Sequence, residues 1–97
     1  MPKVSNIRLR KRLIEILKAH EGDMPSASTL YDMVIESGMS SSLAGSHNRI
    51  AQLCRTTGGI SSMTTRVRGT LGDTYTAEVY YLESEEAFKS WVASKMG

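Results

Sequence analysis

The sequence predicts a small α+β domain in which helices are followed by a two-stranded β-hairpin and a final helix. Apolar residues recur at three- and four-residue intervals through the first half of the chain, which is the period of an amphipathic helix. Residues 74–82 are instead rich in β-branched and aromatic side chains, which favour strands. Because 97 residues suit one domain rather than two, we expect a single domain over residues 1–97.

Two helices are predicted in the first part of the chain. The first covers residues 6–20, and Gly22 lies where such a helix ends. Its apolar stripe consists of Leu9, Leu13, Ile16, Leu17 and His20. The second helix follows Ser26, a residue type that favours the N-cap, and it ends at Gly38. The buried face of this second helix is expected to consist of Leu30, Met33 and Val34.

A third helix is predicted from about residue 42 to residue 56. Its apolar side consists of Leu43, Ile50, Leu53 and Cys54. At about 100° per residue, the opposite side consists of Gly45, Asn48, Arg49, Gln52 and Arg55. This outer face is polar and free of acidic residues, so it is the first candidate for a binding surface.

The last third of the chain predicts a hairpin and a helix. Ile60–Arg68 and Thr74–Leu82 are expected to pair as strands around a turn at residues 69–73. The final helix begins after Ser84, and its apolar stripe consists of Phe88, Trp91 and Val92. That stripe either belongs to the core or forms the seam of a homodimer through the C-terminal helix. The predicted shared core consists of Leu13, Leu17, Leu30, Val34, Ile50 and Val79.

The charge is strongly segmented, although the net charge is only +2. Four blocks follow one another: residues 1–20 carry +5, residues 21–40 carry −4, residues 41–70 carry +4, and residues 71–97 carry −3. The third block contains four arginines and no acid. If the fold brings the two basic blocks together, they form a surface suited to a polyanion.

Several classes of protein are disfavoured by composition. Cys54 is the only cysteine and lies on the predicted apolar stripe, which indicates a core thiol and no internal disulfide. No apolar run approaches the roughly 18 residues of a membrane span, and the basic N-terminus lacks the apolar stretch of a signal peptide. We therefore expect a cytoplasmic protein with no membrane partner. The two histidines show no paired spacing and no catalytic or phosphate-binding motif is present, so we expect a non-enzymatic domain without metal or cofactor.

Four features of the chain are similar to one known fold family. They are the segment Pro25-Ser26-Ala27-Ser28-Thr29-Leu30-Tyr31, the turn Ser37-Gly38-Met39-Ser40, the third helix, and Gly59-Ile60 before the hairpin. Together they resemble the winged helix-turn-helix superfamily over about residues 6–82. In that superfamily the third helix usually enters the major groove, and the hairpin, called the wing, contacts phosphates or the minor groove.

The resemblance implies roles for particular side chains. Base-edge contacts are implied for Ser46, Asn48, Arg49 and Gln52, and phosphate contacts for Arg55, Arg66 and Arg68. The basic cluster around Arg8 and Arg12 either holds phosphate too or is a solvated helix face. Side-chain chemistry agrees, because Arg reads guanine, Asn and Gln read adenine, and Arg neutralises phosphate.

The sequence therefore predicts a DNA-binding winged-helix protein, a transcription regulator whose partner is double-stranded DNA. Two alternatives stay open at this stage. A winged helix also serves as a protein–protein interaction module, as an adaptor or inhibitor of a larger complex. The same basic surface suits RNA or the ribosome, which are recognised by shape.

Overall fold

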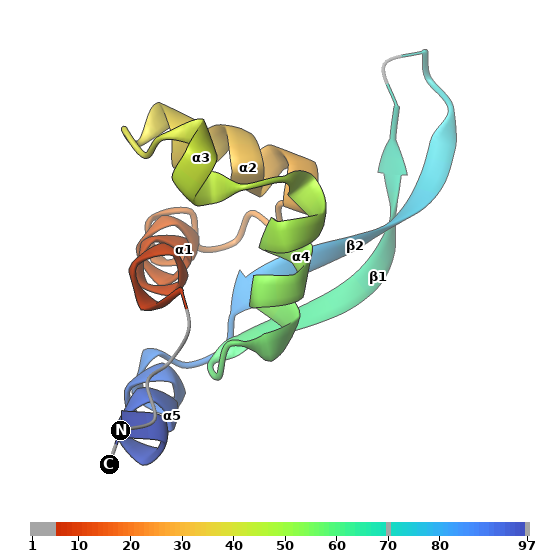
Figure 1. The fold of residues 1–97 in the computed structure, drawn as a ribbon. Helices are drawn as coiled ribbons and strands as arrows, with labels where there is room; N and C mark the ends of the chain where they lie inside the picture. Colours follow the sequence, from red (N-terminus) through yellow and green to blue (C-terminus); the bar gives the residue numbers. More distant parts are fainter. Residues whose placement is uncertain (1–5, 70, 97) are drawn as a thin grey trace.

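A computed structural model describes residues 6–69 and 71–96. The elements are α1 (Ile7–Ala19), α2 (Ala27–Glu36), α3 (Ser41–Ala44), α4 (His47–Thr56), β1 (Ile60–Arg68), β2 (Thr74–Leu82) and α5 (Glu85–Met96). This order confirms the predicted α+β class, with helices followed by a β-hairpin and a C-terminal helix (Figure 1). Within the described residues, no helix is both long and apolar enough to cross a membrane.

The single helix predicted over residues 42–56 is wrong, because the structure contains two helices there. Gly45 ends α3 with a positive φ of 81°, a conformation that a residue with a side chain rarely adopts. Ser46 then caps α4, and its Oγ accepts a hydrogen bond of 3.2 Å from the backbone N–H of Arg49. A glycine that stops one helix directly precedes a serine that starts the next, so the chain turns between them.

The core lies between α1, α2, α4 and the base of the hairpin. Five of the predicted core residues are buried in one cluster: Leu13, Leu17, Leu30, Val34 and Ile50. Val79 is also buried, at 2% exposure, but it lies outside this cluster at the edge of β2. There it pairs with Ser26 in an isolated antiparallel bridge, and the backbone N–H of Tyr80 donates to the carbonyl of Pro25 at 3.0 Å. The connection between α1 and α2 therefore anchors the hairpin to the helices.

The hairpin is an antiparallel pair whose register runs from Ile60 opposite Leu82 to Arg68 opposite Thr74. Its strands have the predicted bounds. Its base packs beside α4, while its far half extends beyond the helices as an arm (Figure 1). This arm makes the molecule long, with extents of 49 × 27 × 21 Å.

Helix α5 packs its apolar stripe against the rest of the same chain. Phe88 is buried, and Trp91 and Val92 are partly buried against the core. Trp91 lies so close to Gly58 that a Cβ built there would approach the Trp91 ring to 2.4 Å. The structure thus places this stripe on the core of one chain, and a homodimer through α5 stays a prediction.

Candidate nucleic-acid interface

Helix α4 presents one apolar face to the core and one polar face to the outside. Ile50, Leu53 and Cys54 are buried on the inner face. With 3.6 residues per turn, Asn48 and Gln52 lie one turn apart on the opposite face, and both are exposed. Within the described residues, neither carboxamide makes a hydrogen bond to the protein. Both side chains are therefore available to a ligand.

The other two predicted base-reading residues are engaged with the protein. Ser46 is exposed at the N-terminus of α4, where its hydroxyl serves as the cap. The guanidinium of Arg49 donates to the side-chain oxygen of Asn6 at the start of α1. A hollow of about 220 Å³ lies beside this pair, lined also by Gln52 and Thr56. Arg49 consequently lies on the side of α4 that faces α1, beside the face that carries Asn48 and Gln52.

Arg55 at the end of α4 forms an ion pair with the hairpin. Its Nη2 lies 2.6 Å from Oε1 of Glu78 on β2, and its Nε donates to the same oxygen at 2.8 Å. The Tyr80 hydroxyl also donates to Glu78, at 2.6 Å. The hydrogen bond from Arg55 is the main reason that the pKa of Glu78 lies below its ordinary value, and the same bond raises the pKa of Arg55.

The role of Glu78 was not predicted from the sequence, because its charge was assigned to the block of residues 71–97 and not to the basic block of residues 41–70 that it contacts. It is the only acidic residue in Thr74–Leu82, and strand pairing was enough to bring it beside the basic block. Its signal in the sequence is a single charge within an otherwise uncharged strand. For Arg55 to make the predicted phosphate contact, a DNA phosphate must therefore replace Glu78 as the partner of its guanidinium.

Arg66 and Arg68 lie on one face of the exposed arm. Residues opposite each other in an antiparallel pair share a face, and so do alternate residues along one strand. Arg66 lies opposite Thr76, and Arg68 lies opposite Thr74, so both share their face with Glu78 two residues farther along β2. Both arginines are exposed, and within the described residues neither makes an ion pair or hydrogen bond through its side chain. Among the residues that the structure describes, they are thus unpaired cations on a projecting strand.

The basic cluster of α1 divides into exposed and buried members. Arg8 is exposed, and Arg12 is half-buried. The guanidinium of Arg12 donates to the carbonyl of Ser37 at the end of α2, at 3.2 Å, and lies 3.9 Å from Glu15. Arg12 therefore already satisfies part of its charge within the protein, while Arg8 stays a candidate for phosphate contact.

Arg10 belongs to the core, in contrast to the solvated or phosphate-binding roles considered for its cluster. It is only 6% exposed. Its Nη1 donates to the Oγ1 atoms of Thr56 and Thr57 at 2.9 and 2.7 Å, and to the carbonyl of Leu53 at 3.3 Å. Its guanidinium also lies 5.3 Å from the ring centroid of Trp91, in cation–π range.

Burial lowers the pKa of Arg10 from its ordinary value. The acceptors around it lie at the C-terminal end of α4, where the helix dipole favours a cation. Arg10 thus fixes α4 against α1 and α5. It is a positioning residue for the candidate interface, because it holds the helix that carries Asn48 and Gln52.

Cys54 is a core thiol, as its place on the apolar stripe predicted. It is 1% exposed, and burial is the main reason that its pKa is raised to about 12. Such a thiol carries almost no thiolate at neutral pH, and the thiolate is the nucleophilic form. No catalytic role is therefore assigned to it.

No protein-family model, curated protein or solved structure matches this chain. The function of the chain is consequently inferred from the geometry of its own residues. Those residues give an exposed amide pair on α4 and two free arginines on the arm.

Proposed function

We propose that this chain is a winged-helix protein that binds double-stranded DNA, with α4 in the major groove and the hairpin on the phosphate backbone. The order of helices and hairpin is compatible with that family. The major groove of B-DNA admits an α-helix, and side chains on its exposed face then meet base edges. We propose that sequence-specific binding of this kind serves to regulate transcription.

The observation that carries the proposal is the placement of the free arginines relative to α4. Arg66 and Arg68 share a hairpin face with Glu78, and Glu78 contacts Arg55 at the end of α4. The arginine face of the arm is therefore the face on which α4 lies. A duplex that received α4 in its groove would have its backbone beside this arm, where two unpaired cations would neutralise phosphates.

The side chains on α4 suggest which bases are read. Asn48 and Gln52 are exposed amides, and such amides bind the N6 and N7 positions of adenine through paired hydrogen bonds. Arg49, which reads guanine in this chemistry, would first have to leave Asn6. We therefore expect adenine to dominate the base preference, with Arg49 contributing less.

The test compares one mixed sequence as a DNA duplex and as an RNA duplex, with fluorescence anisotropy as the readout. Binding should be strongest at about 50 mM salt and fall steeply by about 200 mM, because counterions are released from phosphates. The RNA duplex should bind more weakly. Its deep, narrow major groove excludes a helix, so only the phosphate contacts remain.

Two outcomes would overturn the proposal. Failure to bind any duplex at about 50 mM salt would favour the protein-binding alternative, since that condition strongly favours phosphate contacts. Equal binding of DNA and RNA, without base preference, would favour recognition of RNA by shape.

A further inference from the structure

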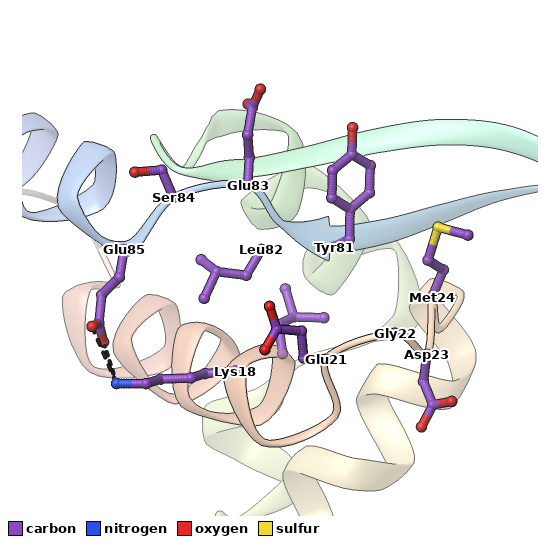
Figure 2. Close-up of a pocket in the computed structure, with 11 residues that line it drawn as sticks. Lys18, Glu21, Gly22, Asp23, Met24, Tyr81, Leu82, Glu83, Ser84 and Glu85 are labelled. Atoms are coloured by element: carbon purple, nitrogen blue, oxygen red, sulfur yellow. Dashed lines mark hydrogen bonds and ion pairs between the residues drawn. The ribbon is translucent and has the colours of Figure 1, made fainter.

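A groove lies at the end of the molecule that carries the start of α5. It has a volume of about 520 Å³ and is formed by the end of α1, the connection from α1 to α2, and the end of β2. Leu17 and Leu82 form its apolar floor, and the side chain of Leu82 points from β2 toward α1 (Figure 2). Met24, which is 45% exposed, lies at its edge beside Tyr81. The groove is therefore large enough and apolar enough for an aliphatic side chain.

The rim of this groove is acidic. The carboxylates in its lining are Glu21, Asp23, Glu83 and Glu85. Of these, Glu83 accepts a hydrogen bond from Ser61 on β1 and points away from Leu82 and α1, so the acidic rim consists of Glu21, Asp23 and Glu85 (Figure 2). Among the described residues, the lining contains one cation, Lys18, whose Nζ lies 3.1 Å from Glu85 and so is already paired. An occupant of matching chemistry presents an apolar side chain accompanied by positive charge.

The tip of the hairpin arm carries that chemistry. Leu71 is 89% exposed, the highest value among the exposed large apolar residues of the described chain. The strand that leads to it carries the unpaired Arg66 and Arg68, and the one acid of the turn, Asp73, leaves the tip net positive. Thus the same molecule exposes an aliphatic side chain with two cations at one end and an acid-rimmed apolar groove at the other.

We propose that the hairpin tip of one copy docks into this groove of a second copy, with Leu71 on the apolar floor and the arginines beside the rim carboxylates. The tip does not reach the groove of its own chain. Strand β2 runs from the tip at Thr74 to the groove at Leu82. Eight residue steps of extended strand span roughly 27 Å.

The contact is head-to-tail, because it joins two different surfaces: the hairpin tip, where β2 begins, and the groove, where β2 ends. A contact made once between two copies leaves one tip and one groove unfilled, so further copies can add at either end. The groove holds little more than one hairpin tip, so the association is weak and concentration-dependent. One consequence rests on the proposed DNA function: duplex DNA that takes Arg66 and Arg68 should dissociate these chains.

Sedimentation velocity without DNA tests the self-association by itself. The average sedimentation coefficient of the wild type should rise with concentration at about 50 mM salt and rise less at higher salt, where charges are screened. Leu71→Ser should remain monomeric. Met63→Ser is the matched control and should associate like the wild type, since Met63 is 45% exposed on the hairpin but lies away from the tip. The double variant Glu21→Lys/Asp23→Lys should also remain monomeric, because it replaces two rim carboxylates with cations that repel the arginines of the tip. Both residues lie in the exposed connection after α1, so the fold should be kept.

Mixing the two monomeric variants gives the decisive result. Leu71→Ser keeps an intact groove, and the Glu21→Lys/Asp23→Lys variant keeps an intact tip, so the mixture should form a one-to-one dimer and nothing larger. A symmetric interface through α5 would not be restored in this way. A monomeric wild type at high micromolar concentration, unchanged association of Leu71→Ser, or a mixture that stays monomeric would each overturn the proposal. If the wild type does not bind DNA but the two variants still form a dimer on mixing, the proposed function is overturned and the self-association is not.

Discussion

Arg10 of α1 and the two arginines of the hairpin arm lie in opposite environments. Arg10 is buried and donates to three oxygen atoms at the end of α4, with the Trp91 ring beside it. Arg66 and Arg68 are exposed, and the described part of the chain supplies no partner for their side chains. Along the sequence, both regions look like basic clusters. In the structure, one holds the fold together and the other is available to a ligand.

The difference teaches that the number of cations in a segment does not tell how many of them are available to bind a polyanion. A cation in water binds a polyanion readily, because its partner there is only solvent and salt. A cation that already satisfies buried acceptors would leave them unpaired if it moved, which is costly. Arg12, Arg49 and Arg55 lie between these limits, because their partners are exposed or half-buried.

The largest expected effect concerns the buried member of this comparison. Arg10→Ala should lower the free energy of unfolding by about 2–4 kcal/mol, because the buried Thr57 hydroxyl loses the guanidinium that donates to it and the contact with the Trp91 ring is lost as well. Arg8→Ala, an exposed change in the same helix, should stay within about 0.5 kcal/mol. Urea unfolding followed by the fluorescence of Trp91, the only tryptophan, measures both. Equal effects of the two variants would show that Arg10 does not fix α4.

The second prediction concerns the exposed member. Arg66→Ala and Arg68→Ala should each lower DNA affinity roughly tenfold at about 50 mM salt and reduce the salt slope by about one, whatever the DNA sequence. Stability should be almost unchanged, since both side chains are exposed and neither has a hydrogen-bond or ion-pair partner within the described residues. Lys89→Ala removes the same charge from α5, where the side chain is 63% exposed, and should leave binding unaltered. A matching loss in Lys89→Ala would mean that net charge alone drives binding.

How much the sequence could predict depends on how local each feature is. Both hairpin strands and the start of α5 follow from residue types close together in the chain, and their predicted positions are confirmed. The break at Gly45–Ser46 was also local, but the apolar period on both sides concealed it. Arg10 reaches residues 43 to 47 positions away, and Arg55 reaches Glu78 across 23 positions. Periodicity within one element carries no information about such pairs.

The third prediction concerns base preference, which phosphate contacts do not supply. Gln52→Ala should reduce discrimination at one base position by about 1–3 kcal/mol, because it removes an amide that pairs with adenine. Affinity for sequences with the unfavoured base should change little. A panel of duplexes that differ at single positions measures this. A uniform loss across the panel would show that Gln52 supports the position of α4 and does not read a base.

The smallest expected effect concerns Arg55, which is paired with Glu78, whereas Arg66 and Arg68 have no partner within the described residues. Glu78→Gln keeps an acceptor for the Tyr80 hydroxyl but removes the carboxylate that holds Arg55. The pKa of Glu78 lies below its ordinary value, so in the wild type this carboxylate remains charged and competes with phosphate at neutral pH. The variant should bind DNA a few-fold more tightly, with a salt slope steeper by about one.

Two further variants separate the release of Arg55 from a general change in charge. Glu86→Gln removes one carboxylate from α5, where the side chain is 85% exposed, and should give no comparable gain. Adding Arg55→Ala to Glu78→Gln should abolish the gain, because the released cation is then absent. If the double variant keeps the tighter binding, the cause is the lost repulsion between Glu78 and phosphate. If Glu78→Gln changes neither DNA affinity nor the salt slope, Arg55 lies out of reach of the DNA backbone. Arg66 and Arg68 are then the phosphate contacts that remain on this side of the protein.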